Sequence, residues 1–130
     1  MSLGFGKNLF VIPLLTAACM MALAADEPAA TVKMTAKKQF VPAKVTIKVG
    51  QTVEWVSEDP QHAHDITTDP GEVEDRSLVQ IPKGAKQFSS KMLHLGEKFQ
   101  YRFVVPGTYK YACPPHEANN MTGTIEVEPQ

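Results

Sequence analysis

The sequence predicts an all-β protein, a β-sandwich with antiparallel strands and Greek-key connections, and three observations support this fold class. Short apolar runs alternate with polar residues at every second position, which is the period of a half-buried strand. The runs are rich in branched and aromatic side chains, and proline or glycine separates them at short intervals. No segment after residue 25 has the apolar period of an amphipathic helix. Several short strands in a chain of 130 residues indicate one domain of this architecture.

The predicted strands lie between residues 45 and 128. Five runs show the alternation, and each is expected to form a strand: 45–49, 52–55, 99–103, 109–113 and 124–128. Residues 64–67 are expected to begin a further strand after Pro60. The stretch 69–90 lacks the period, and we predict a long crossing loop with at most one short helical turn.

Residues 1–24 differ from the rest and predict a signal peptide that is removed, which leaves a mature domain of residues 25–130. Lys7 precedes an almost wholly apolar run, and Ala22 and Ala24 supply the small residues of a cleavage site. A membrane anchor is the alternative, but the run 9–23 is short and contains a proline, whereas a spanning helix needs about 20 apolar residues. The surroundings of Cys19 also resemble a lipidation box, which gives lipid anchoring as a second alternative. We therefore expect export to the periplasm without stable membrane insertion.

The mature chain is nearly neutral and contains a single cysteine. Removal of the signal takes away Lys7 and Cys19, leaving 12 of the 13 Lys and Arg against 14 Asp and Glu, a formal charge of −2. A nucleic-acid-binding protein would instead carry a clustered basic excess. Cys113 remains without a disulfide partner in an oxidising compartment, so it is either an inert core thiol or a metal ligand.

The segment that follows the strand 109–113 has the strongest chemical pattern in the sequence. Cys113, His116 and Met121 fall on one short loop with the spacing Cys-x2-His-x4-Met. Thiolate, imidazole and thioether suit copper in both oxidation states, and two His, one Cys and a weak axial Met form the blue-copper arrangement. Calcium and magnesium would require oxygen ligands, and zinc rarely takes a thioether. The loop therefore predicts a site for one copper ion.

The second histidine of such a site must come from another segment, and spacing leaves three candidates. His64 ranks first because it opens the predicted strand 64–67. His62 would share its face if that strand were regular, but it follows Pro60 and Gln61 in what reads as an entering loop. His94 lies in a predicted turn and ranks third.

These residues resemble the plastocyanin-type cupredoxins, the small blue copper proteins that include plastocyanin and pseudoazurin. The resemblance covers residues 31–128 and is carried by four motifs: Val45-x-Ile47-x-Val49-Gly50-x-Thr52-Val53-x-Trp55, His64-x-Ile66, Pro106-Gly107-Thr108-Tyr109-x-Tyr111-x-Cys113 and Cys113-x2-His116-x4-Met121-x-Gly123. It implies a Greek-key sandwich of about eight strands, with His64, Cys113, His116 and Met121 as ligands of one copper ion. It further implies a monomeric one-electron carrier that docks transiently with larger redox proteins, such as c-type cytochromes or copper enzymes.

Two residues depart from the pattern of that family. Asp65 stands where the family usually has Asn, and Pro114 follows the cysteine where a backbone N–H or hydroxyl is often available. Because charge beside a metal tunes its chemistry, we hypothesise that an ionised Asp65 favours Cu(II) and lowers the reduction potential.

Alternative functions make different demands on the sequence. A copper-delivery module would have a more open, methionine-rich site, and only Met121 lies near this loop. A copper enzyme needs a second copper class, and His62-x-His64 is the lone His-x-His pair in the chain. The acidic segment 69–75 contains Asp69, Glu72, Glu74 and Asp75. It is equally consistent with a solvated face and with a surface that steers a basic partner.

Overall fold

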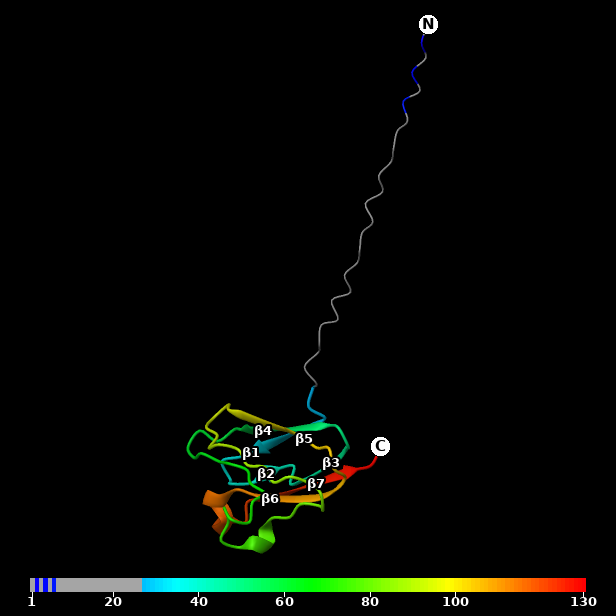
Figure 1. The fold of residues 1–130 in the computed structure, drawn as a ribbon. Helices are drawn as coiled ribbons and strands as arrows, with labels where there is room; N and C mark the ends of the chain where they lie inside the picture. Colours follow the sequence, from blue (N-terminus) through cyan, green and yellow to red (C-terminus); the bar gives the residue numbers. More distant parts are fainter. Residues whose placement is uncertain (1, 3, 5, 7–26) are drawn as a thin grey trace.

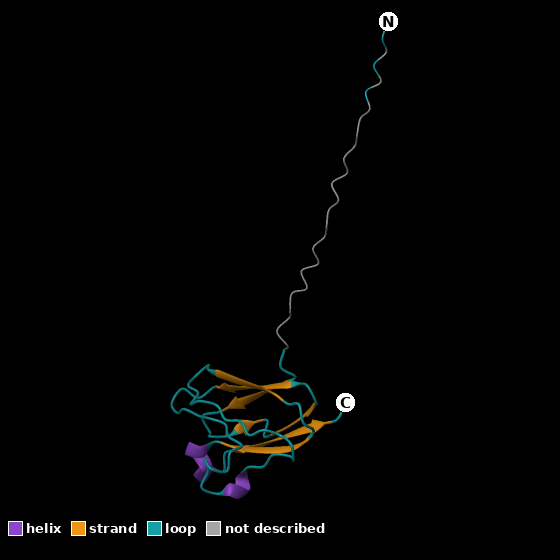
Figure 2. Ribbon diagram, in the orientation of Figure 1, coloured by secondary structure: helices purple, strands orange, loops and turns teal. Residues whose placement is uncertain are grey.

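The computed structural model describes residues 2, 4, 6 and 27–130, and within this part of the chain it consists of strands and two short 3₁₀ helices (Figures 1 and 2). The strands are β1 (Ala30–Met34), β2 (Phe40–Val41), β3 (Lys44–Lys48), β4 (Thr52–Ser57), β5 (Lys98–Arg102), β6 (Gly107–Ala112) and β7 (Thr122–Glu128), and the helices are η1 (Arg76–Leu78) and η2 (Pro114–Asn119). Apart from residues 2, 4 and 6, the predicted signal peptide, which includes Cys19, lies outside the described residues. None of the helices in the described part has the length and apolar character needed to span a bilayer.

The strands form two sheets that face each other, with the order β2-β1-β4-β5 in one and β3-β7-β6 in the other. This confirms the all-β sandwich. The antiparallel expectation was wrong for two pairings, because β1 runs parallel to β4 and β3 runs parallel to β7. Alternation of apolar and polar residues marks a half-buried strand of either direction, so the sequence pattern contains no information that separates the two.

The five strands predicted from alternation are all present, within a few residues of the expected bounds. Two other short strands, β1 and β2, lie near the start of the domain and were not predicted from the alternation. Residues 64–67 do not form a regular strand. They make isolated bridges instead, His64 with Leu93 and Thr67 with both Ser89 and Ala112. The described residues therefore contain seven strands rather than about eight.

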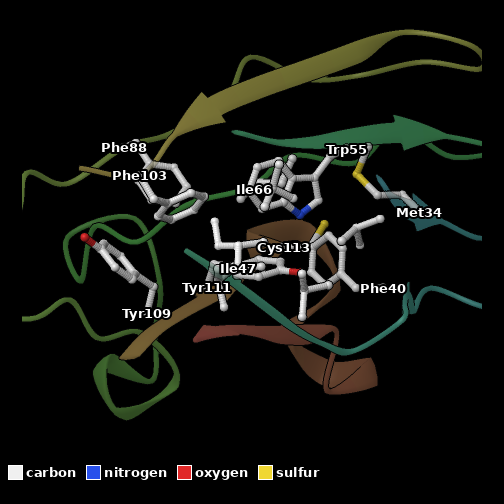
Figure 3. Packing of buried hydrophobic residues seen from close by; sticks show 14 of the residues in the cluster. Met34, Phe40, Ile47, Trp55, Ile66, Phe88, Phe103, Tyr109, Tyr111 and Cys113 are labelled. Carbon is white, nitrogen blue, oxygen red and sulfur yellow. The ribbon is translucent and has the colours of Figure 1, made fainter. Parts of the chain in front are cut away.

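The core lies between the two sheets and is rich in aromatic rings (Figure 3). Trp55 from β4 and Tyr111 from β6 both point into this space, and their ring centroids lie 5.4 Å apart in an edge-to-face arrangement. Phe40 packs on the Tyr111 ring from β2, with centroids 4.7 Å apart. On the neighbouring strand, Gly123 pairs with Tyr111, and a Cβ atom at Gly123 would overlap the tyrosine ring. The aromatic core thus fixes the end of β6 just before Cys113.

The stretch 69–90 is the predicted crossing loop and contains one short helical turn, η1. Asp75 caps this turn, because its side chain accepts a hydrogen bond from the backbone N–H of Ser77 at 3.0 Å. The loop is fastened to β6 through paired backbone hydrogen bonds between Gln80 and Lys110. Both expectations for this stretch are confirmed.

Candidate metal centre

Three of the four predicted ligands come together at one end of the sandwich, beyond the end of β6. Cys113 follows β6 directly, and Pro114 then opens η2. Residues 113–121, which we call the ligand loop, close on themselves through backbone hydrogen bonds. The N–H of Cys113 donates to the carbonyl of Met121 at 3.0 Å, and the N–H of His116 donates to the carbonyl of Cys113 at 3.0 Å. Asn120 ends η2 in the left-handed conformation, which asparagine tolerates better than most residues.

His64 reaches the same place from a segment far away in sequence. Its backbone pairs with Leu93 through two hydrogen bonds of 3.0 and 2.6 Å. Three residues later, Thr67 pairs with Ala112 at the end of β6 through two bonds of 3.0 Å. We call residues 59–67 the histidine arm. Its two bridges hold His64 against the start of the ligand loop.

The donor atoms of His64, Cys113 and His116 converge on one small volume. The two Nδ1 atoms of His64 and His116 are 3.1 Å apart. The sulfur of Cys113 lies 3.3 Å from Nδ1 of His116 and 3.8 Å from Nδ1 of His64. All three residues are buried, and all three donor atoms lie within 4.8 Å of one another. Two imidazole nitrogens and one sulfur are the equatorial donor set of a blue copper centre, so the residues present fit a copper ion.

The remaining predicted and competing residues occupy distinct places. Met121 closes the ligand loop and is fully buried in the core. His62 does not belong to the converging group, and 40% of its side chain is exposed. His94 also lies outside that group, in a turn where its carbonyl accepts the N–H of Glu97.

The thiol of Cys113 lies in surroundings that disfavour its ionisation when no cation is near. Burial raises the pKa of Cys113 to about 12, and the neighbouring carboxyl of Asp65 contributes to the rise. A bound metal cation reverses this balance, because a coordinated thiol is deprotonated. A buried sulfur facing two imidazole nitrogens is therefore suited to a metal rather than to free thiolate chemistry.

Asp65, the first departure from the family pattern, lies directly beside the sulfur. Its Oδ1 is 3.8 Å from Sγ of Cys113. Partial burial raises the pKa of Asp65 to about 6, against the effect of its hydrogen bond with the thiol, and Glu72 adds like-charge repulsion. Pro114, the second departure, has no N–H to donate, and the contact seen for the Asp65 carboxyl is with the sulfur of Cys113.

Asp59 is a residue of this site that the sequence analysis missed. Its carboxylate is buried and accepts a hydrogen bond at 2.9 Å from Nε2 of His64. The ring of His62 and the backbone N–H groups of Gln61 and His62 also donate to it. Burial alone would raise the pKa of Asp59, but these hydrogen bonds outweigh it and hold the pKa well below the usual range. In sequence, Asp59-Pro60 reads as an ordinary turn. The signal that could have found Asp59 is a carboxylate a few residues before a metal-binding histidine.

The ligand loop is also fastened to its surroundings by two polar side chains. The carboxylate of Glu117 accepts backbone N–H groups of Glu74 and Asp75 at 3.1 Å, which links the loop to the acidic segment. On another side, Nε2 of Gln39 donates to the carbonyl of Asn119 at 3.1 Å. The acidic segment is therefore attached to the site and not merely close to it in sequence.

Comparison with known proteins agrees with this geometry. Residues 28–128 match the model of the copper-binding proteins of the plastocyanin/azurin family. The chain belongs to this family. A plastocyanin from Scenedesmus fuscus is 36% identical over 89 residues, which cover 68% of this chain and 86% of that protein.

Two solved structures are similar in fold to this protein. A Sinorhizobium pseudoazurin superposes with a TM-score of 0.60 at 28% identity, covering 77% of this chain and 74% of its own. A copper-containing nitrite reductase from Thermus scotoductus SA-01 gives a TM-score of 0.59 at 30% identity, and the match covers 78% of this chain but only 22% of the reductase.

Family membership and the converging His–Cys–His group confirm the functional prediction made from the sequence. The protein is a blue copper protein of the plastocyanin type that binds one copper ion and carries electrons.

Proposed function

We propose that His64, Cys113, His116 and Met121 ligate the copper ion, and that the protein carries single electrons between larger redox partners. The convergence of the two Nδ1 atoms and the cysteine sulfur supports the first three ligands. Met121 is supported by its complete burial and by the backbone hydrogen bond that joins it to Cys113. Met121 would add a thioether sulfur to the donor set, a ligand type that suits copper.

The protein contributes rigidity to this chemistry. When bound, copper supplies one-electron chemistry between Cu(II) and Cu(I), and these two states prefer different geometries. The ligand loop has two prolines directly after Cys113 and is closed by the backbone hydrogen bond between Cys113 and Met121. The bridges of His64 and Thr67 hold the histidine arm. Ligands fixed in this way move little when the charge changes, so little reorganisation accompanies each electron transfer.

The path for the electron runs through His116. His64 and Cys113 are completely buried, whereas 8% of His116 is exposed. Among these three residues, only His116 therefore has any surface that a partner can approach. A redox protein that covers this surface would exchange electrons with the site through a single imidazole.

We propose electron transfer without catalysis. Within the described residues, one group of side chains converges as metal donors, and it is the group already assigned. A copper reductase or oxidase requires a second set of ligands at which substrate binds. The likeness to the nitrite reductase extends over 22% of that enzyme and supports a shared domain.

The location and partners follow from the same reasoning. We propose that residues 1–24 direct export to the periplasm and are removed, with lipidation at Cys19 as the alternative. The mature domain is proposed to act as a monomer that docks transiently with c-type cytochromes or copper enzymes. The near-neutral formal charge, without a clustered excess of basic residues in the sequence, supports this role over nucleic-acid binding.

The decisive experiment is titration of the metal-free protein with Cu(II), followed by visible spectroscopy and voltammetry. We expect one equivalent to produce an intense thiolate-to-copper absorption band and a reversible one-electron wave. Met121→Leu should retain the band and change the potential. His94→Gln, at a histidine outside the converging group, serves as the matched control with both unchanged. Preferential binding of zinc without colour would contradict the proposal. Facile loss of Cu(I) to a chelator would instead indicate a copper-delivery module.

A further inference from the structure

The histidine arm contains a buried charge that the ligand set does not use. Asp59 is only 1% exposed, and its side-chain partners in the described part of the chain are two histidine rings rather than lysine or arginine. Burying a carboxylate without a basic partner is costly unless hydrogen bonds compensate it. The burial of the Asp59 carboxylate therefore needs a functional explanation.

The contact with His64 has a direct consequence for the metal site. The ring of His64 has two nitrogens, and its Nδ1 faces Cys113 and His116 while its Nε2 lies 2.9 Å from Oδ2 of Asp59. A carboxylate only accepts hydrogen bonds, so Nε2 must carry the proton. In the neutral ring, Nδ1 then presents its lone pair to the place where the other donors converge.

Asp59 is itself held in position before any metal binds. Its Oδ1 accepts the backbone N–H groups of Gln61 at 2.8 Å and His62 at 3.1 Å, an arrangement that closes the turn at Pro60. Its Oδ2 is thereby directed at His64, and the ring of His62 contacts the same oxygen at 3.1 Å. The carboxylate is a fixed point from which the ring of His64 is oriented.

We propose that Asp59 is a positioning residue for the copper centre, which fixes the tautomer and orientation of His64 and stabilises Cu(II) relative to Cu(I) through the charge it places behind that ring. A carboxylate hydrogen-bonded to a ligating imidazole makes the imidazole a stronger donor, and the higher oxidation state gains more from this. The inference rests on the proposed ligand role of His64. It adds a residue that controls how readily the site gives up its electron.

The first test uses the unsubstituted protein. Nitrogen NMR of the metal-free form reports which ring nitrogen of His64 carries the proton. We expect a single Nε2–H tautomer whose proton exchanges slowly with solvent. A proton on Nδ1, or a rapidly exchanging mixture of tautomers, would overturn the proposal. This measurement does not depend on the folding of any variant.

The second test replaces Asp59 by the neutral residue of the same shape. Asp59→Asn should lower the ratio of Cu(II) to Cu(I) affinity by about tenfold, which corresponds to a rise of about 59 mV in the midpoint potential. Asp59→Ala should in addition allow a mixture of His64 tautomers in the metal-free form. If Asp59 only shapes the turn, both variants would lose thermal stability while the potential and the tautomer stay as they are.

Two controls separate this effect from others. Glu58→Gln removes the same charge from the adjacent residue, whose exposed side chain pairs with Lys33 at 3.2 Å. It should leave the potential nearly unchanged, and a shift equal to that of Asp59→Asn would show a general charge effect and overturn the proposal. His94→Gln changes a histidine outside the converging group, and it should leave the tautomer of His64 unchanged. Failure of the unsubstituted protein to give a blue, reversible site would refute the proposed function, whereas a normal site insensitive to Asp59→Asn refutes this inference alone.

Discussion

The two halves of the metal centre are held together by different means. The ligand loop is a continuous segment that closes through its own backbone, from Cys113 to Met121. The histidine arm provides a single donor, His64, and depends on contacts with distant residues such as Leu93 and Ala112. The first half is encoded by local spacing and the second by the fold of the whole domain. Substitutions in the two halves should therefore fail in different ways.

The largest expected effect comes from the cysteine of the ligand loop. Cys113→Ser should abolish the intense visible band completely, because that band arises from electron donation by the thiolate sulfur to copper. Absorption spectroscopy after addition of one equivalent of Cu(II) measures it. Retention of the band in Cys113→Ser would show that another residue supplies the sulfur.

The next largest effect concerns the strand pair that supports the ligand loop. Gly123→Ala would place a Cβ atom into the ring of Tyr111, which is fully buried between the sheets. We expect a loss of about 2 kcal/mol in the free energy of unfolding, the range found for overpacked cores. Urea denaturation of the metal-free protein measures this loss. Gly123→Ala combined with Tyr111→Leu should recover part of it, and no recovery would show that the ring is not the obstacle.

A smaller and pH-dependent effect is expected within the histidine arm, at Asp65. Because the pKa of Asp65 is raised to about 6 in the folded metal-free protein, its ionisation destabilises the fold as the pH rises from about 4 to 6 and remains unfavourable above that. Asp65→Asn should then stabilise the metal-free protein at pH 8 by about 1 kcal/mol, a value reduced for partial exposure, and should have little effect at pH 4. Thermal unfolding at the two pH values measures the difference.

The same substitution tests the effect of Asp65 on the loaded site. Removal of a negative charge next to Cys113 should raise the midpoint potential, because Cu(II) loses more stabilisation than Cu(I) does. An unchanged potential in Asp65→Asn would refute the hypothesis that this departure from the family pattern tunes the metal. Glu58→Gln again provides the matched control for loss of one charge at a distance.

The smallest effect is expected where the ligand loop meets the acidic segment. Glu117→Gln weakens the acceptor for the backbone N–H groups of Glu74 and Asp75, and we expect a loss of about 0.5 kcal/mol in stability. Hydrogen exchange at these two amides should become faster while the visible band stays the same. Unaltered exchange would mean that the link does not hold the acidic segment in place.

The same contrast explains how far the sequence could predict the structure. Cys113, His116 and Met121 could be proposed as ligands because a tight loop between two strands brings nearby residues together. The alternation around Trp55 and Tyr111 likewise predicted strands, since a half-buried strand imposes its period on the sequence.

The remaining features depend on contacts between residues far apart in sequence, and a local sequence pattern contains no information about such contacts. Spacing ranked His64 first and His62 second, and the family resemblance then assigned the ligand position to His64. Asp59 was missed because its burial results from the packing of the histidine arm, while its sequence neighbourhood resembles a solvated turn. The parallel pairing of β1 with β4 could not be predicted, because side chains alternate with the same period of two in parallel and antiparallel strands.

The complete burial of the cysteine sulfur has a consequence for the life of the protein before it acquires its metal. A thiol with a raised pKa holds little of the thiolate that oxidants and disulfides attack, and no part of Cys113 is open to another chain. The folded polypeptide can therefore persist in an oxidising environment without forming crosslinked dimers or sulfenic acid. Folding and metal loading can then be separate events in its maturation, because the folded metal-free protein stays chemically unmodified until copper binds.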